Sequence, residues 1–496
     1  MEYREVRVRP LGQHSGVDRF DLSDMDHTMP KIYVQIAEIF ELPPNANRTH
    51  IVESLSSGLA FALGQYPVLA GVLRMDASNG RMWVVKKEDS TVGLFVKDDS
   101  KTSGAGEGDH LPSFAHLEAN DFPVQLIDGY KVLPKVVTEK QVFSPLGDNA
   151  DDDATIISAF QATFIEGGLI LAAAIHHNCS DGPGCDVFLT TWAENAAAAL
   201  RGEPFKPVNQ SNNSRDQLIA LKHSAEHWVE LDSKFPLLKN LGAPPPAPPP
   251  DFKMPDLKGR IWHVSRSNAA RLKEACAQAD AVRWVSTYDC IMALFWKTIT
   301  RAKIPLLSLD PNTEVTLIHA VNARNLLEPP LPDRFLGNAV VFAHVSIGSI
   351  EDLITTKNNL PLLAAAVRQS IQTITPQYAA EVPEWVAGLE DRRYITLDMD
   401  SFLGLNLAGN SWQAMTPYEH HDFGFGLPKA VRWPHPLCEG SIIALPSRAT
   451  VKKGAARGVD DDEGVEICFC LEEGCHDRLL QDAELLRFAR PRGLNA

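Results

Sequence analysis

The chain has 496 residues, of which 44% are hydrophobic and 22% are charged. This balance is typical of a globular protein and excludes a disordered or fibrous one, and the length predicts two or three domains. The formal net charge of −16 argues against nucleic acid or an anionic membrane surface as the main partner. Any ligand that carries phosphates would therefore need a local basic patch.

The first thirty residues contain no apolar segment typical of a secretory signal, and apolar stretches such as residues 169–175 and 339–343 are too short to span a bilayer. The eight cysteines lack the regular spacing of a secreted disulfide framework. We therefore expect a cytoplasmic protein with reduced thiols and no membrane partner.

The first predicted helix has apolar residues at Leu55, Leu59 and Leu63 and ends at Tyr66-Pro67, because proline disfavours helix in the residue before it. Two apolar runs at residues 159–166 and 169–176 meet at Gly167-Gly168. Glycine pairs between such runs are typical of a β-hairpin. An amphipathic segment at 187–200 and a helix-like segment at 216–232 follow.

The proline run at 243–250 (APPPAPPP) can form neither a helix nor a sheet interior, so it marks the better of two domain boundaries; the other break is the Gly/Ser-rich stretch 100–110. We predict an N-terminal domain (1–202), a crossover linker (203–250) and a C-terminal domain (251–496). In the last, a strand at 260–264 leads to a helix with Ser267 as a candidate cap, and Ser286 and Thr287 open a second helix. Helices alternate with short strands, which favours an α/β fold.

Cys468, Cys470, Cys475 and His476 lie close together in the sequence and resemble a metal-binding group. The segment 465–471 alternates as a strand does, however, which places the first two thiols on one face of a sheet. The spacing does not favour a zinc site, and no metal is expected.

The first segment whose side chains could carry out chemistry is Ile175-His-His-Asn-Cys-Ser-Asp-Gly182, at the end of a buried strand. Adjacent residues of a strand point to opposite faces, so His176 and His177 have different surroundings: one faces a cleft and the other packs. A neutral imidazole accepts a proton from an alcohol near neutral pH. Taken alone, the segment leaves a structural, a general-base and a metal-binding role open.

The second such segment is Tyr418-Glu-His-His-Asp-Phe-Gly-Phe-Gly426. Glycine alternating with phenylalanine suits a tight turn that approaches another part of the backbone closely. A plain aromatic-glycine turn is the alternative.

Together these segments resemble the BAHD acyltransferases, whose HxxxD and DFGWG signatures occur in this order; Phe425 replaces the tryptophan. The similarity extends over nearly the whole chain and is greatest to the fungal branch with the trichothecene 3-O-acetyltransferases. Further segments that carry it are residues 22–26, 54–74, 285–296, 320–324, 329–332, 337–338 and 482–488.

The resemblance implies two similar chloramphenicol-acetyltransferase-like domains, each a mixed β-sheet layered with helices, with a solvent channel at their interface. It implies an acyl-CoA-dependent O-acyltransferase in which His177 is the general base and Asp181 pairs with Arg324 in a structural role. Gly182, Asp422, Gly424 and Gly426 are implied to be structural residues at the site.

Two further groups of residues are assigned through the resemblance. Asn410 and Trp412 are candidate donors to the oxyanion, although Trp412 is equally well a core aromatic. For the coenzyme A phosphates, the backbone at Ser286 and Thr287 offers a helix N-terminus, and a basic group offers charge, although such charge runs are usually solvated loops. The basic residues are Lys429, Arg432, Arg448, Lys452 and Lys453.

The implied substrates are acyl-CoA, with acetyl-CoA as the expected donor, and a small-molecule alcohol of specialised metabolism, with no permanently bound cofactor and no nucleic-acid partner. The family implies a monomer. Two alternatives remain open: a condensation-type domain that uses a carrier-bound thioester or forms an amide, and a same-fold enzyme that uses the histidine for another reaction.

Overall fold

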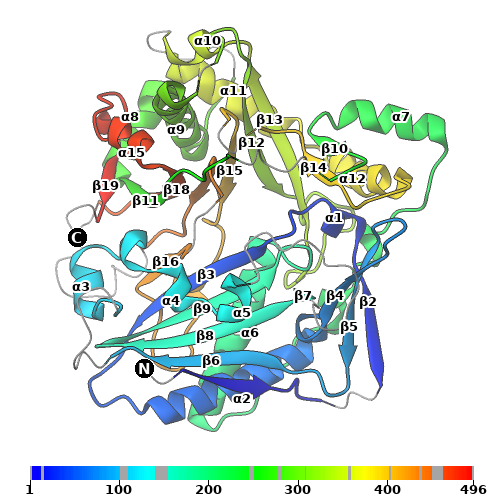
Figure 1. Ribbon diagram of the computed structural model, residues 1–496, viewed down its shortest axis with the longest axis vertical. Helices are drawn as coiled ribbons and strands as arrows, with labels where there is room; N and C mark the ends of the chain where they lie inside the picture. The colour runs from blue at the N-terminus through cyan, green and yellow to red at the C-terminus, as the bar shows by residue number, and fades with distance from the viewer. Residues whose placement is uncertain are drawn as a thin grey trace.

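The structure is a computed structural model that describes most of the chain. The described residues are 3–12, 16–100, 110–139, 155–244, 251–277, 282–307, 309–355, 359–400, 404–434, 438–449 and 462–493. Two layered α/β halves lie one above the other in Figure 1, the N-terminal half below and most of the C-terminal half above. None of the helices within the described ranges has both the length and the apolar character needed to cross a bilayer.

The lower half is built on a six-stranded mixed sheet in the order β1-β6-β8-β9-β3-β16. The predicted hairpin forms: β8 and β9 are antiparallel and meet at Gly167, whose φ of 72° suits glycine. The strands are β1 (Tyr3–Val8), β3 (Tyr33–Glu41), β6 (Val92–Asp98), β8 (Ser158–Ile165), β9 (Gly168–His176) and β16 (Ala430–Arg432).

Side chains of β9 alternate between two cores. The odd-numbered residues of 169–175 pack into the core under α2 and α6, whereas Ile170 and Ala172 pack on the opposite face, the face that α3 and α4 cover (Figure 1). This period of two explains why the strand is apolar throughout. The helices of this half are α1 (Asp24–His27), α2 (Arg48–Gln65), α3 (Phe114–Ala119), α4 (Gly129–Val132), α5 (Lys135–Thr138), α6 (Gly182–Arg201), η1 (Pro67–Ala70) and η2 (Val124–Leu126).

A four-stranded sheet with the order β2-β5-β4-β7 flanks the first one. The strands of this smaller sheet are β2 (Val17–Asp21), β4 (Val72–Met75), β5 (Met82–Lys87) and β7 (Thr155–Ile156).

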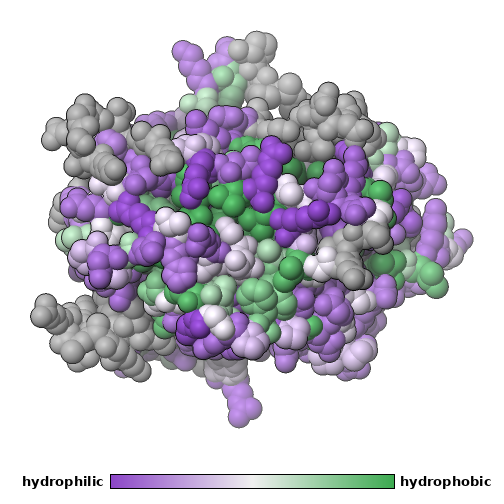
Figure 2. Space-filling model, turned by 90° about the horizontal axis from the view of Figure 1, so that it is seen from below, coloured by the Kyte–Doolittle hydropathy of each residue, from purple (hydrophilic) through white to green (hydrophobic). Residues whose placement is uncertain are grey.

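The face of the molecule seen from below carries apolar residues that are bordered and interrupted by hydrophilic ones (Figure 2).

The upper half is built on a seven-stranded mixed sheet in the order β13-β12-β15-β17-β18-β11-β19. Helices α8, α9, α11 and α15 contribute to the core on one face, and Ile261, Ile443 and Cys468 join the core of the lower half from the other. The strands are β11 (Leu257–Val264), β12 (Val315–Asn322), β13 (Val340–Ile347), β15 (Leu407–Ser411), β17 (Ser441–Ala444), β18 (Val465–Glu472) and β19 (Arg490–Arg492).

A two-stranded sheet, β10 (Leu238–Asn240) with β14 (Ile395–Leu397), ties the crossover segment to the upper half. The remaining helices are α8 (Arg266–Cys276), α9 (Thr287–Lys303), α10 (Ile350–Ile354), α11 (Leu360–Gln372), α13 (Pro417–His420), α15 (Glu473–Leu479), η6 (Ile304–Leu306) and η7 (Leu485–Arg487). The crossover helix α7 (Ala225–Lys234) follows the short 3-10 helices η4 (Gln210–Asn213) and η5 (Asp216–Leu218), and it packs against α12 (Pro376–Gly388) of the upper half.

Three expectations about elements differ from the structure. β16 pairs antiparallel with β3, so residues 430–432 of the predicted C-terminal domain belong to the sheet of the lower half. Within the helix-like segment 216–232, Asp216–Leu218 form only a short 3-10 helix, and the α-helix begins at Ala225 after its cap, Ser224. Ser265 rather than Ser267 caps α8, and its hydroxyl accepts from the N–H of Asn268 at 3.2 Å.

Candidate active site

The two neighbouring histidines at the end of β9 have different surroundings. His176 is the last residue of the strand, is fully buried, and contacts the ring of Tyr33 edge-on at 5.2 Å. Burial lowers the pKa of His176 to about 3, so this ring is neutral and packs in the interior. His177 lies just beyond the strand and is only half-buried.

The backbone of His177 is held on both sides. Its N–H donates to the carbonyl of Ile32 at 2.8 Å, and its carbonyl accepts from Asn338 Nδ2 at 2.8 Å. Nδ1 is buried without a hydrogen-bond partner on another described residue, and because the residue as a whole is partly exposed we infer that the ring reaches solvent through Nε2. Burial lowers the pKa of His177 against the opposing effects of its own carbonyl and Asp181. A neutral imidazole can accept a proton at Nε2.

A buried polar network supports this backbone. Asp26 accepts from Asn338 Nδ2 at 2.7 Å and from Arg215 Nε at 2.9 Å, and Arg215 also donates to the carbonyl of Cys179 at 2.8 Å. Asn338 therefore connects Asp26 to the carbonyl of His177. No sequence motif points to Arg215, whereas Asp26 and Asn338 lie in segments 22–26 and 337–338, which carry the family resemblance.

Asp181 and Arg324 form the buried pair that the resemblance implies. The guanidinium contacts both carboxylate oxygens, at 2.8 and 2.9 Å, and the carboxylate also accepts from the N–H groups of Gly184 and Ala339. Burial by itself raises the pKa of Asp181, but Arg324 outweighs it and holds the pKa below its usual value. Because all these contacts fix Asp181, its carboxylate does not orient the His177 ring by a direct hydrogen bond.

Asn410 and Trp412 lie at the end of β15, in the upper half. A Cβ atom added to Gly182 would lie 3.3 Å from Trp412 Nε1, so the indole stands at the start of α6, five residues after His177. Alternation along the extended chain places Asn410 on the same side as Trp412, and the side chain of Asn410 is partly exposed. The structure thus brings the two candidate donors toward the helix that follows His177.

The DFGFG segment lies at the other end of α6. Asp422 accepts from the N–H groups of Gly424 and Gly426, and both glycines have φ above 100°. A Cβ atom on Gly424 would lie 2.7 Å from Leu200, about 27 Å along the helix from Gly182 at 1.5 Å per residue. The three motif residues shape a turn, as expected, but this turn is remote from His177.

Residues 114–486 match the transferase family, and residues 32–195 match a trichothecene 3-O-acetyltransferase-like N-terminal domain. The first match covers more than half of the chain. The chain belongs to the transferase family. The resemblance to the fungal branch of the BAHD acyltransferases is confirmed, and the protein is an acyltransferase.

Curated relatives align with this chain over most of their own length. Acetyltransferase FGR3 of Gibberella zeae is 26% identical over 98% of this chain and 94% of its own. Trichothecene 3-O-acetyltransferase TRI101 of Fusarium sporotrichioides is 24% identical over 84% and 86%. The crystal structure of F. graminearum TRI101 with coenzyme A and T-2 mycotoxin has a TM-score of 0.75 at 18% identity, covering 96% of this chain and 99% of that one. Vinorine synthase has a TM-score of 0.63 at 16% identity, over 99% and 100%. The predicted two-domain fold is confirmed.

The basic group expected to bind phosphates in this acyltransferase is not assembled as predicted. Arg432 is fully buried and its five N–H groups are occupied by the Glu466 carboxylate and the carbonyls of Asp121, Phe122 and Val431. The expectation for Arg432 is therefore wrong, because no donor remains for a phosphate.

Arg448 is also buried, beside Asp121 at 3.2 Å and over the ring of Phe122. It belongs to the same internal network as Arg432, so the expectation that it binds a phosphate is wrong as well. Lys429 is partly exposed and lies 3.7 Å from Glu41, at the end of β3 opposite to Tyr33 and hence to the histidines. Lys452 and Lys453 lie outside the described residues.

Ser286 and Thr287 open α9 as predicted. The Ser286 hydroxyl accepts from the N–H of Asp289, and the Asp289 carboxylate accepts from the N–H of Ser286. Arg368 neutralises Asp289 with two hydrogen bonds. The hydroxyl of Ser286 is thus engaged in capping, and a ligand at this helix start would meet backbone N–H groups.

A buried histidine beside DFGFG gives the acyltransferase a pH-dependent core. His421 contacts Glu38 at 2.5 Å on one side and Thr190 and Asp186 on the other. Burial alone lowers the pKa of His421, but the two carboxylates outweigh it and raise the pKa to about 10. The imidazolium is therefore a buried structural charge at neutral pH.

We expect this charge to make stability fall at alkaline pH. Since the folded pKa is above the unfolded value of about 6.5, the contribution is complete below about pH 6.5 and is lost as pH rises toward 10, by about 3–5 kcal/mol. Urea unfolding at pH 6, 8 and 10 measures it as the difference between the wild type and His421→Gln. The neighbouring exposed His420→Gln is the matched control; a wild-type slope in His421→Gln would contradict the assignment.

Proposed function

We propose that the protein is an acyl-CoA-dependent O-acyltransferase that transfers an acyl group, in the first place acetyl, to a hydroxyl of a small specialised metabolite. The observation that carries this proposal is the partly exposed His177, with its backbone clamped, its pKa lowered by burial and its Nδ1 buried, so that Nε2 is the nitrogen left for an acceptor. A base for an alcohol must be neutral at working pH and must present one free ring nitrogen.

The proposed mechanism passes through a ternary complex. His177 Nε2 removes the proton from the acceptor hydroxyl while that oxygen attacks the thioester carbonyl. The tetrahedral intermediate then expels the thiolate as the C–S bond breaks, and the imidazolium returns the proton to the sulfur. The acyl group thus passes directly from sulfur to the acceptor oxygen, without a covalent enzyme intermediate.

Negative charge on the former carbonyl oxygen requires donors placed in advance. We propose Asn410 and Trp412 Nε1 for this role, because Asn410 lies near the end of β15, Trp412 directly follows that strand, and the indole stands beside Gly182. For the phosphates of coenzyme A we propose the first turn of α9, at Ser286 and Thr287. Tyr288 of this turn would meet a Cβ atom on Gly409 at 3.1 Å, so the turn lies next to the strand that carries Asn410.

The acceptor class rests on the relatives. Two of them are named trichothecene 3-O-acetyltransferases, and related TRI101 structures contain coenzyme A with T-2 mycotoxin or deoxynivalenol. We propose that this acyltransferase likewise acts on a multicyclic alcohol, in the cytoplasm and as a monomer.

The test measures thiol release from acetyl-CoA by the purified chain with a panel of fungal alcohols that includes deoxynivalenol. Acceptor-dependent release of coenzyme A, with a product heavier by one acetyl group, is expected. Calorimetry with free coenzyme A is expected to show binding even before an acceptor is found. Transfer only from a carrier-bound thioester, without measurable binding of coenzyme A, would instead favour a condensation-type enzyme.

A further inference from the structure

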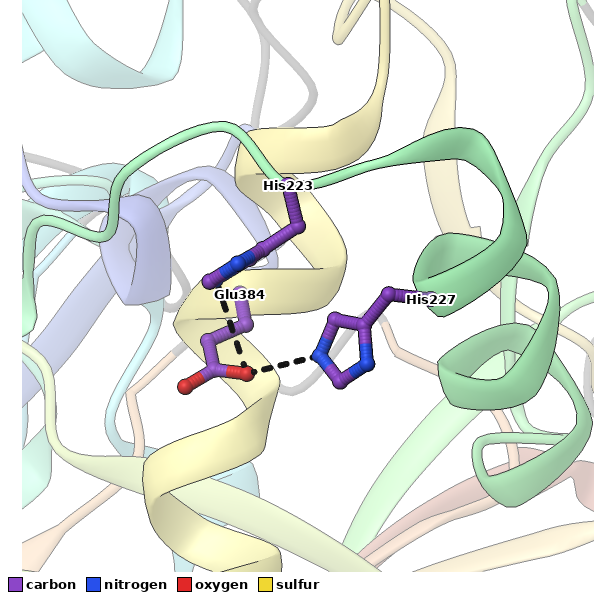
Figure 3. A group of neighbouring side chains, drawn as sticks. All are labelled: His223, His227 and Glu384. Carbon is purple, nitrogen blue, oxygen red and sulfur yellow. Dashed lines mark hydrogen bonds and ion pairs between the residues drawn. The ribbon is translucent and has the colours of Figure 1, made fainter.

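Three side chains that take no part in the proposed acylation converge at the surface where the crossover segment meets the upper half. His223 precedes α7, His227 lies in the first turn of α7, and Glu384 projects from α12 (Figure 3). One nitrogen or oxygen atom of each residue lies within 4.8 Å of those of the other two. The two imidazole rings stand 4.9 Å apart and both turn toward the same carboxylate.

Ordinary hydrogen bonding explains only part of this arrangement. His227 Nε2 lies 3.3 Å from Glu384 Oε2, and His223 Nε2 lies 3.7 Å from the same oxygen. The second distance is too long for a hydrogen bond. Ligands at about 2.0–2.1 Å from a tetrahedral zinc ion stand about 3.3–3.4 Å apart. The first distance fits a hydrogen bond as well as a pair of ligands, whereas His223 turns toward the carboxylate without a hydrogen bond to it, as a ligand of a common ion would.

The packing of α7 against α12 fixes the backbone that carries His227 and Glu384. Trp228 stacks on Trp385 with ring centroids 6.4 Å apart, and its Nε1 donates to the Trp385 carbonyl at 3.0 Å. A Cβ atom on Gly388 would lie 1.9 Å from Trp228, which shows how closely α7 approaches α12. The helical backbone of two of the three ligands is thus fixed before any ion arrives, as a tight metal site requires.

Access and chemistry both favour a divalent transition metal. The side chains of His223, His227 and Glu384 are each about one-third exposed, at 36%, 36% and 32%, so an ion can enter from solvent. Two imidazoles with one carboxylate are a ligand set that zinc uses in proteins, with water in the fourth position. The nearby Lys234 is engaged by Glu381 and Glu230.

We propose that His223, His227 and Glu384 bind one Zn²⁺ ion that fastens the crossover helix α7 to α12 of the upper half. The site does not touch the acylation chemistry, so it stands or falls independently of the proposed function. Because the ion binds the folded chain, it stabilises that state by mass action.

The full chain is stripped with a chelator and titrated with ZnCl₂ by calorimetry. The wild type is expected to bind one equivalent, and to give the visible absorption of a tetrahedral site with Co²⁺. His227→Gln and Glu384→Gln are each expected to weaken binding more than tenfold. The exposed His116→Gln is the matched control and keeps wild-type affinity.

Thermal unfolding provides a second readout. At a hundredfold excess of Zn²⁺ over its dissociation constant, the wild-type Tm is expected to rise by about 2 °C or more, and the rise is absent in both ligand variants. Circular dichroism verifies that the variants fold. Equal binding in the wild type, His227→Gln and Glu384→Gln, or no saturable binding below about 100 µM in the wild type, overturns the proposal.

Discussion

Replacing His177 with alanine is expected to lower kcat for acyl transfer by about 10²–10⁴, the range typical of a lost general base. The backbone of His177 is clamped by Ile32 and Asn338 and its Nδ1 is buried, which leaves Nε2 to meet the acceptor hydroxyl. Steady-state kinetics with acetyl-CoA and a competent acceptor measure the loss. The KM for acetyl-CoA is expected to change little, because the imidazole acts on the acceptor hydroxyl.

The adjacent histidine offers a matched control for this experiment. His176→Ala removes a fully buried ring that packs against Tyr33, so we expect it to destabilise the protein more than His177→Ala does. We expect His177→Ala, in turn, to lower kcat more than His176→Ala does. A fall of less than tenfold in kcat for His177→Ala would remove the general-base assignment, whatever the stability of the two variants.

Much of the fold could be predicted from the sequence because local signals agree with tertiary packing. The Gly167-Gly168 hairpin and the helix ending before Tyr66-Pro67 both form. In these cases the turn residue and the apolar period point to the same structure. The prediction for segment 216–232 was wrong, because its apolar residues suggested one continuous helix. The α-helix begins only after the Ser224 cap.

The pairing of β16 with β3 could not be predicted, because it joins residues almost four hundred positions apart in the chain. A three-residue strand carries no periodicity of its own. Its place in the sheet is set by the packing of Phe423 against Phe40 and Trp192, which only the tertiary structure shows.

The site was predicted unevenly for the same reason. The HxxxD pattern identified His177 and Asp181, and the family pattern pointed to Arg324. Arg432 was misassigned because a basic residue in sequence shows its charge but not its partner, and the buried carboxylate that binds it, Glu466, lies 34 residues away. Likewise, Glu384 is 157 residues from His227, so no spacing rule could have shown the group that we propose to bind zinc.

Removing the Asp181 carboxylate is expected to produce the largest loss of stability among the site variants. Asp181→Ala leaves the buried Arg324 guanidinium without its counter-charge and also removes the cap of α6. Stranding a buried charge costs about 3–5 kcal/mol, and losing the cap adds about 1 kcal/mol. Urea denaturation measures the difference, and kcat is expected to fall as well, since Asp181 is four residues from His177.

Two comparisons separate the charge pair from general damage at this position. The double variant Asp181→Asn, Arg324→Met keeps a capping side chain and removes both charges, so it is expected to recover part of the stability that Asp181→Ala loses. In the wild type, the pKa of Asp181 lies below its unfolded value. Its contribution is therefore complete above about pH 4 and is lost as pH falls through the folded pKa. The double variant should lack this acid-dependent component, and an unchanged acid limb would show that the Asp181–Arg324 pair does not contribute to stability as expected.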